Sequence, residues 1–204
     1  MSTILQLAEN AAKKVGWHRK QPAFVCNKRL VFEASLNSTI GLVWSQAPIE
    51  FILHTIDEPT VAEHQIESAE ETMSRRERGV MLLKGFASGR EVFHLQITDK
   101  IETVAALIPS RRVSDRPVFI YDCYTDPDYR GRGIYPAALT WLLKSLYGKG
   151  VDRAFLRTHP QNVSSIRGAV KAGFRLCGIM YHLSFFGLCP KPFGRTFQTN
   201  VGAE

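Results

Sequence analysis

The sequence feature that most constrains the fold is a glycine-rich loop between a strand-like run and a helix-like run. The stretch "DPDYRGRGIYPAAL", residues 126–139, joins "PVFIYDCYT" to "IYPAALTWLLKSLY". The first turn of a helix presents backbone N–H groups without intrahelical partners and the positive end of the helix dipole. Glycines allow close approach to the backbone and arginines attract anions, so the loop predicts a pyrophosphate cradle.

The alternative is a tight turn in which Gly131 and Gly133 only permit the bend. Two common phosphate-binding motifs are excluded. No GK[ST] follows the loop, so it is not a Walker loop, and Pro136 breaks the GxGxxG dinucleotide pattern.

The order of elements predicts a mixed α/β fold. Asp57 as a cap and Pro59 in the first turn favour a helix up to Gly79. Turn signals predict two hairpins, one from residues 29–36 and 41–46 and one from residues 80–89 and 90–99. The other expected elements are helices at 4–15, 134–148 and 162–173 and strands at 49–56, 102–109, 118–125, 152–159 and 177–187. We expect residues 1–47 to form a helix and hairpin extension, and residues 48–204 to form the main domain.

Composition narrows the class of protein. The chain has 204 residues, 45% hydrophobic and 22% charged, which suits one large domain. Its four cysteines form no CxxC pair, which is typical of reduced thiols and not of a zinc site. The N-terminal segment is too polar for a signal peptide and no run of 18 apolar residues occurs, so we expect a cytoplasmic protein that does not span a membrane. The net charge of +7 suits anionic partners, but no nucleic-acid motif is recognisable.

Two segments resemble the GNAT (GCN5-related) acyltransferases. "YRGRGI" is similar to the family pattern [QR]-x-x-G-x-[GA], with Arg130 at the first position and Gly133 at the fourth. Residues 162–174, "NVSSIRGAVKAGF", are similar to N-x-x-A-I-x-x-Y-x-K-x-G-F. The resemblance covers residues 118–186 well and residues 48–117 in element order only; residues 1–47 are not covered.

The resemblance implies a mostly antiparallel, twisted central sheet flanked by helices, with a splayed pair of strands that forms the acyl-CoA cleft. It implies acetyl-CoA as cosubstrate and no metal. Cys123 to Thr125 would lie along the pantetheine, and Asn162, which is equally well explained as a helix cap, would help to hold it. The pyrophosphate would bind the backbone N–H groups of the loop, which belong to Arg130, Gly131, Arg132, Gly133, Ile134 and Tyr135.

Two positions depart from the family pattern. Tyr135 stands where the pattern has Gly or Ala, and its ring must turn away if its N–H is to meet a phosphate. Ala169 stands where the family often has a Tyr that protonates the leaving thiolate. Tyr124, Tyr181 and Tyr135 are the candidate replacements for this acid.

Strand alternation suggests a base. In "FIYDCYT", Asp122 and Tyr124 would share one face, with Tyr121, Cys123 and Thr125 on the other. An acidic residue in an apolar strand needs a binding partner or a function, so Asp122 is either the general base, directly or through water, or a structural residue that pairs with an arginine or caps a β-bulge. Three histidines are further candidates, each with a structural alternative: His94, His159 and His182.

The sequence therefore favours an acetyl-CoA-dependent N-acyltransferase acting on a primary amine of a small molecule by direct attack on the thioester. The alternatives are a non-catalytic acyl-CoA-binding module, an acyltransferase with a longer acyl donor and a nucleic-acid-binding protein. No sequence feature indicates an oligomeric state.

Overall fold

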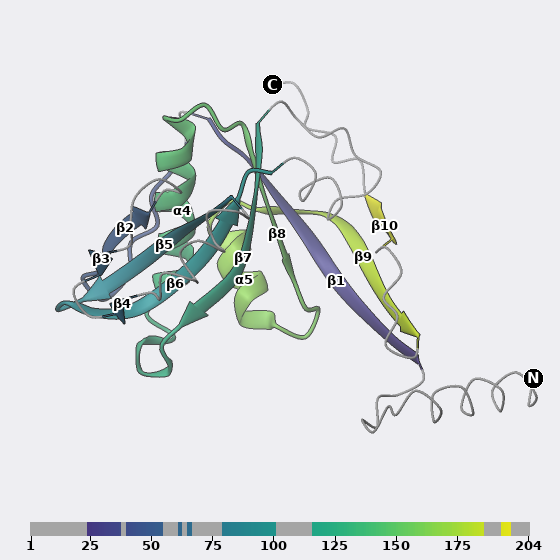
Figure 1. The fold of residues 1–204 in the computed structure, drawn as a ribbon, viewed down its shortest axis with the longest axis horizontal. Coiled ribbons are helices and arrows are strands. Elements are labelled where there is room, and N and C mark those ends of the chain that lie inside the picture. The colour runs from purple at the N-terminus through teal and green to yellow at the C-terminus, as the bar shows by residue number, and fades with distance from the viewer. Residues whose placement is uncertain are drawn as a thin grey trace, which may run out of the picture.

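A computed structural model of the protein describes residues 24–37, 40–54, 61–62, 65–66, 79–100, 116–185 and 193–196. Its main element is an eight-stranded sheet in the order β10-β9-β1-β8-β7-β6-β5-β2, with a separate two-stranded pair, β3-β4 (Figure 1). The strands are β1 (Phe24–Ser35), β2 (Glu50–His54), β3 (Val61–Ala62), β4 (Gln65–Ile66), β5 (Val80–Ala87), β6 (Arg90–Thr98), β7 (Pro117–Thr125), β8 (Arg153–Thr158), β9 (Arg175–Phe185) and β10 (Phe193–Thr196). The helices are the 3-10 turn η1 (Pro127–Tyr129), α4 (Ile134–Tyr147) and α5 (Val163–Lys171).

The sheet is antiparallel at every pairing except one, between β7 and β8. These two strands are joined through α4, because parallel neighbours need a crossover connection and a helix supplies it. The expected mixed α/β class with a mostly antiparallel sheet is thus confirmed.

Two clusters of buried side chains mark the two faces of the sheet. The larger cluster joins α4 and α5 to strand residues such as Phe93, Val118 and Ile120. The smaller one contains Phe119 and Phe155, which alternate with residues of the first cluster along their strands. Because successive side chains of a strand point to opposite faces, α4 and α5 cover the same face.

The hairpin of β5 and β6 is confirmed. Its turn residues Ser88 and Gly89 have φ values of 49° and 78°. Two consecutive residues with positive φ give a turn whose twist matches that of paired strands.

The hairpin expected from residues 29–36 and 41–46 is wrong. Residues 29–35 belong to β1, which pairs with β8 and β9 inside the sheet. Residues 40–49 form no strand and instead cross α4, where the backbone N–H of Val43 donates to Thr140 Oγ1 at 3.1 Å and that of Gln46 to the Arg132 carbonyl at 2.8 Å. Two backbone N–H groups of this segment thus find their partners on the helix and the loop in place of a neighbouring strand. The boundary after residue 47 stays a prediction, although β1 is part of the same sheet.

The helix expected at 57–78 is wrong at its start, because β3 and β4 pair there as short antiparallel strands. Its remainder, and the elements expected at 4–15 and 102–109, lie outside the described residues. β9 is followed by a further short strand, β10, which pairs with it. Among the helices in the described part of the chain, none is long and apolar enough to cross a membrane.

Candidate acyl-CoA site

The loop before α4 is built from two left-handed glycines. Gly131 and Gly133 have φ values of 77° and 74°, a conformation that disfavours residues with a β-carbon. A β-carbon added at Gly133 would meet only the Trp44 carbonyl oxygen at 3.7 Å and the Cα of Ser45 at 3.9 Å, so the backbone conformation, and not crowding, requires glycine there. The loop thus turns sharply from η1 into α4.

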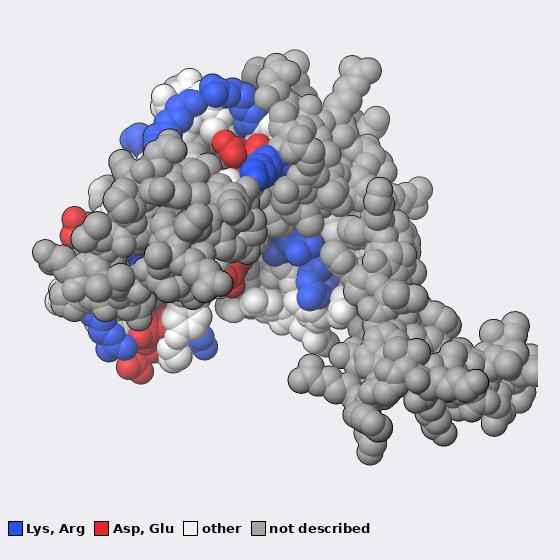
Figure 2. Space-filling model, in the orientation of Figure 1, with Lys and Arg blue, Asp and Glu red and all other residues white. Residues whose placement is uncertain are grey.

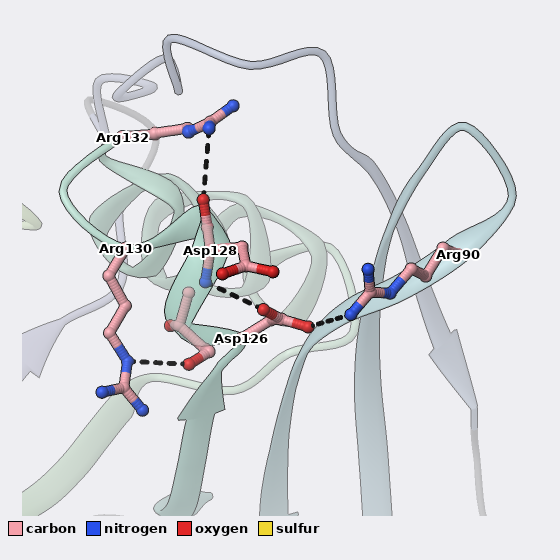
Figure 3. Close-up of polar contacts among 6 residues, drawn as sticks. Arg90, Asp126, Asp128, Arg130 and Arg132 are labelled. Carbon is pink, nitrogen blue, oxygen red and sulfur yellow. Dashed lines mark hydrogen bonds and ion pairs between the residues drawn. The ribbon is translucent and has the colours of Figure 1, made fainter.

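Polar contacts fix the approach to this loop (Figure 3). Asp126 Oδ1 accepts from the N–H of Asp128 at 2.9 Å and caps η1, while its Oδ2 pairs with Arg90 Nη2 at 2.6 Å. The Arg130 side chain turns back along β7 and donates to the Thr125 carbonyl at 3.0 Å. Arg132 points elsewhere, to the Asp128 carbonyl at 3.1 Å.

The first turn of α4 is open to an anion. Among the described residues, no side chain caps it, and Gly133 occupies the N-cap position. Ile134 and Tyr135 supply N–H groups there, whereas Pro136 has none. Uncapped N–H groups at the positive end of a helix dipole are what a phosphate group requires, so these residues fit the pyrophosphate of CoA.

β7 and β8 separate next to the loop. Their parallel pairing begins at Pro117 opposite Arg153 and stops at Ile120 opposite Leu156, yet β7 runs on to Thr125 and β8 to Thr158. The sheet therefore opens between the ends of these strands, as expected for the splayed pair.

A cleft of about 730 Å³ lies at this opening, between β7, the loop, α4 and α5. Three cations, Arg130, Arg167 and Lys171, line it, and no carboxylate of the described residues does. Of the predicted cofactor residues, the structure brings together Cys123, Thr125, Arg130, Gly131, Gly133, Ile134, Tyr135 and Asn162. Arg132 is not part of this lining, and its guanidinium lies 5.1 Å from the centre of the Tyr129 ring.

Arg167 was not predicted to line the cleft, and Lys171 was identified only as a residue that matches the family pattern in segment 162–174. Their spacing of four residues on α5, which places two side chains on one face of a helix, was the available signal. The charged side chains on the visible described surface otherwise lie in separate groups of both signs (Figure 2).

Tyr135 turns its ring from the loop toward α5. The ring lies over Gly168, where an added β-carbon would be 2.5 Å from Tyr135 Cδ1. Desolvation is the main cause that raises the pKa of Tyr135, and the nearby Cys123 thiol raises it further. A hydrogen bond with Ser165 acts in the opposite direction and lowers it. Desolvation and the Asp122 carboxylate raise the pKa of Cys123 to about 12, although part of this residue is exposed in the cleft. Both groups therefore stay protonated at neutral pH.

α5 begins at a capping residue, Asn162, and has Ala169 at the position where the family often has a tyrosine. Asn162 Oδ1 accepts from the Ser165 N–H at 3.1 Å and from Ser164 Oγ at 3.0 Å, so the helix-cap interpretation is confirmed. Ala169 is fully buried in the larger core cluster. Tyr181, one of the three candidate acids, lies on β9 opposite Lys28 of β1 and does not line the cleft.

A β-bulge in β7 decides which side chains face the cleft. Asp122 and Cys123 together stand opposite one residue of β6, and Asp122 has a φ of 50°. Asp122 Oδ2 accepts from Gln96 Nε2 at 3.0 Å on the face opposite α4 and α5, which it shares with Tyr124 as predicted. The bulge also puts Tyr121 on this face, so its predicted placement beside Cys123 is wrong. Asp122 has an amide partner in place of an arginine, whereas the other structural alternative, a position at a β-bulge, agrees with the strand pairing.

His94 belongs to a polar cluster on the same face. Its Nδ1 lies 3.0 Å from Glu91 Oε1, and Lys84 Nζ lies 2.9 Å from Glu91 Oε2. The His94 ring stacks on Tyr124, with 5.2 Å between ring centres. The hydrogen bond from His94 lowers the pKa of Glu91, burial opposes this, and Lys84 lowers it further. The sequence analysis missed Lys84, Glu91 and Gln96.

The two remaining candidate histidines add nothing to this cluster. His159 Nδ1 accepts from the Gln161 N–H at 3.2 Å and shapes the turn before α5. The side chain of His182 lies outside the described residues. Within the described part of the chain, no group of three or more His, Cys, Asp or Glu side chains is placed to hold a metal ion.

Comparisons with known proteins agree with this geometry. A family model described as "Acetyltransferase (GNAT) family" matches residues 49–174. A GCN5-related N-acetyltransferase from Sphaerobacter thermophilus is similar in structure, with a TM-score of 0.52 and 17% identity, over 86% of this chain and 56% of that one. A Drosophila protein is similar with a TM-score of 0.53 and 10% identity, over 87% of this chain and 57% of that one. No curated protein sequence matches significantly.

The fold, the glycine loop at a helix start and the splayed strands define a GNAT-type architecture. The family match covers more than half of the sequence, so the chain belongs to the GNAT family, as the two sequence segments predicted. The chain spans less than two thirds of the length of the two similar structures.

Proposed function

We propose that the protein is an N-acyltransferase that transfers an acetyl group from acetyl-CoA to a primary amine of a small molecule. The observation that carries the proposal is the cleft between β7, the glycine loop, α4 and α5, which has three cations, no described carboxylate and an uncapped helix start. A cosubstrate that carries phosphates at one end and a neutral thioester at the other matches this distribution of charge.

The proposed cofactor residues divide by chemistry. The N–H groups of Gly131 to Tyr135 bind the pyrophosphate, and Arg130 adds charge at the edge of the cleft. Cys123 and Thr125 lie along the pantetheine on the β7 side, and Asn162 lies on the α5 side. Arg132 contributes its backbone N–H and attraction at longer range, since its guanidinium is held over Tyr129.

Asp122 and Tyr124 are the proposed catalytic residues. Asp122 presents an exposed carboxylate on the face opposite the cofactor helices and takes the proton of the amine, directly or through water. Tyr124 lines the cleft and its ring stacks on His94 of that face, which supports the proposal that its hydroxyl donates to the departing sulfur. The reaction is direct attack by the amine nitrogen on the thioester carbonyl, which depends mainly on positioning.

The second candidate function is a non-catalytic acyl-CoA-binding module. The observation that favours it is Ala169, which is buried and offers no proton donor where the family often has one. This candidate shares the cofactor cleft and differs only in turnover. The cytoplasmic location expected from the sequence stays a prediction.

Two measurements on the purified protein test the proposal. CoA at about a hundred times its dissociation constant should stabilise the fold by roughly 2.7 kcal/mol, because a cradle of N–H groups exists only in the folded state. A melting temperature that millimolar CoA leaves unchanged would contradict the cleft assignment. Acetyl-CoA with a panel of amines should release free thiol; tight CoA binding without release for any amine would favour the binding module.

The variant Asp122→Asn tests the proposed base. Asn keeps the size of the side chain and tolerates the positive φ of this position, but it removes basicity. We expect turnover to fall by about 10² to 10⁴ with CoA affinity unchanged, and to recover partly at high pH, where the acceptor is already a free amine. Loss of stability with activity reduced only in proportion would identify Asp122 as structural.

A further inference from the structure

Two β-bulges turn polar side chains onto one face of the sheet, opposite α4 and α5. In β6 the extra residue is Val92, since Gly85 lies opposite Phe93 while Phe86 lies opposite Glu91. Val92 and Phe93 both enter the core beneath α4, so Glu91 and His94, three residues apart, come to the same face. The bulge in β7 does the same for Asp122. Bulges that re-aim side chains are common beside active sites.

The Lys84–Glu91 ion pair supports the array from within the sheet. The Lys84 side chain is only 6% exposed and that of Glu91 21%. Burying a charge is costly unless it is paired, and a hydrophobic pair at these positions would serve the sheet as well or better. The pair holds Glu91 ionised at neutral pH, because the hydrogen bond from His94 and the nearby Lys84 keep its pKa below the ordinary value, against burial.

Glu91 determines how the His94 imidazole is used. An ionised carboxylate only accepts hydrogen bonds, so Nδ1, at 3.0 Å, carries the hydrogen in the neutral ring, and Nε2 carries the lone pair. The His94 side chain is 33% exposed, and its ring stacks on Tyr124, which is itself 44% exposed and lines the cleft. A basic nitrogen is thus held immediately behind a residue of the cofactor site.

We propose that His94 is the terminal proton acceptor for the amine substrate, with Glu91 and Lys84 as positioning residues and with Asp122 and Tyr124 between His94 and the thioester. The acceptor is then a cationic amine, attracted by the Asp122 carboxylate and the Tyr124 ring face. This inference rests on the proposed acyl transfer and assigns its acceptor site to the face of β5, β6 and β7 opposite α4 and α5.

The proton balance is explicit. The ammonium group gives one proton to neutral His94, directly or through Asp122 or water, and becomes an amine. Its nitrogen forms a bond to the thioester carbonyl carbon, and the carbon–sulfur bond breaks with its electron pair on sulfur. The second nitrogen proton ends on the thiolate, aided by Tyr124, and His94 releases its proton to solvent. Imidazole suits this task because its ordinary pKa of about 6.5 lies near neutral pH.

The test compares His94→Gln and Glu91→Gln with His159→Gln, which makes the same change at a histidine in a turn outside the cleft lining. In the wild type, kcat/KM should rise with pH as the imidazole loses its proton. His94→Gln should abolish this rise of kcat/KM with pH and lower turnover at neutral pH by about 10²-fold or more, and it should leave the CoA-induced thermal shift unchanged. Glu91→Gln removes the carboxylate that orients the ring and should lower kcat with the CoA-induced thermal shift kept, whereas His159→Gln should leave the pH profile and kcat unchanged.

A binding measurement separates this inference from the proposed function. The His94 ring signals in a ¹H–¹³C spectrum should shift when n-butylamine is added to the CoA-bound protein, and these shifts should weaken in Asp122→Asn. Two outcomes would overturn the role of His94 and leave the acyl transfer intact. In the first, the wild type transfers the acyl group but the His94 signals do not shift with n-butylamine. In the second, His94→Gln is as active as the wild type across the pH range. No transfer to any amine by the wild type would overturn the acyl transfer and the inference together.

Discussion

The contact between Tyr135 and Gly168 allows a test in which the same substitution has opposite signs in two backgrounds. Gly168 lies inside α5 and is buried, and a β-carbon there would be 2.5 Å from Cδ1 and 2.9 Å from Cε1 of Tyr135. Atoms at these distances overlap, so Gly168→Ala must displace the ring. The ring is packed between α4 and α5, with Phe93 at 6.5 Å between ring centres.

Two terms set the magnitude. Alanine in a helix interior is favoured over glycine by about 1 kcal/mol. Over-packing at a close contact costs about 1 to 3 kcal/mol. We therefore expect Gly168→Ala to leave the free energy of unfolding unchanged or to lower it by up to about 2 kcal/mol. In the Tyr135→Ala background the overlap is absent, so the same substitution should raise it by about 1 kcal/mol.

The assay is urea unfolding of the wild type, both single variants and the double variant. The free energies of unfolding are compared on the condition that all four proteins have the same m value, which is the slope of this free energy against urea concentration. The expected coupling energy is about 1 to 3 kcal/mol. Additive effects, or a stabilising Gly168→Ala in the wild type, would show that the Tyr135 ring does not occupy the space above Gly168. The reasoning about how a bulky residue fits beside the phosphate loop would then fail.

Three further predictions concern the loop and the charged groups. Gly133→Val should weaken CoA binding more than it lowers the stability of the fold. The control is Gly173→Val, a substitution at another positive-φ glycine, which lies in open space after α5. If Gly133→Val lowers CoA binding and fold stability only to the same extent, the glycine has a purely structural role. Glu91→Gln should lower the free energy of unfolding at pH 7 by about 3 kcal/mol, because it leaves Lys84 buried and unpaired. Since the folded-state pKa of Glu91 lies below its ordinary value of 4.5, this difference should shrink in urea titrations as the pH falls below 4.5; a constant difference would contradict it. Iodoacetamide at pH 8 should alkylate Cys123 at least about 10-fold more slowly than free cysteine, as followed by mass spectrometry, because the raised pKa of about 12 leaves little thiolate; labelling as fast as that of free cysteine would contradict it.

The part of the fold that could be predicted is the part with local signals. The helix starts at Gly133 and Asn162 and the Ser88–Gly89 turn are decided by backbone conformation and capping within a few residues, and the structure agrees with each. The partner of β1 is not a local property. The segment reads as half of a hairpin because a turn-like sequence follows, but its hydrogen bonds go to β8 and β9, more than a hundred residues away.

The residues that line the proposed cofactor cleft were largely predictable, and the polar cluster that we propose as the acceptor side was not. Residues of the cleft follow from one loop and one helix cap, whereas Lys84, Glu91 and His94 meet only through strand pairing. Strict alternation places Glu91 and His94 on opposite faces, since they are three positions apart. Only the bulge at Val92, which no sequence pattern here indicates, brings them together.

The two departures from the family pattern near the cofactor have a shared structural explanation. A tyrosine at position 135 needs space beside α5, and Gly168 provides it because any side chain there would meet the ring. The ring packs against the larger core cluster, which contains the fully buried Ala169. Because protein interiors are close-packed, a tyrosine at 169 would also need space in this cluster, so we expect the loss of the usual hydroxyl on α5 and the bulky residue on α4 to be coupled. On this reasoning, position 169 should accept a larger side chain more readily once the Tyr135 ring is removed.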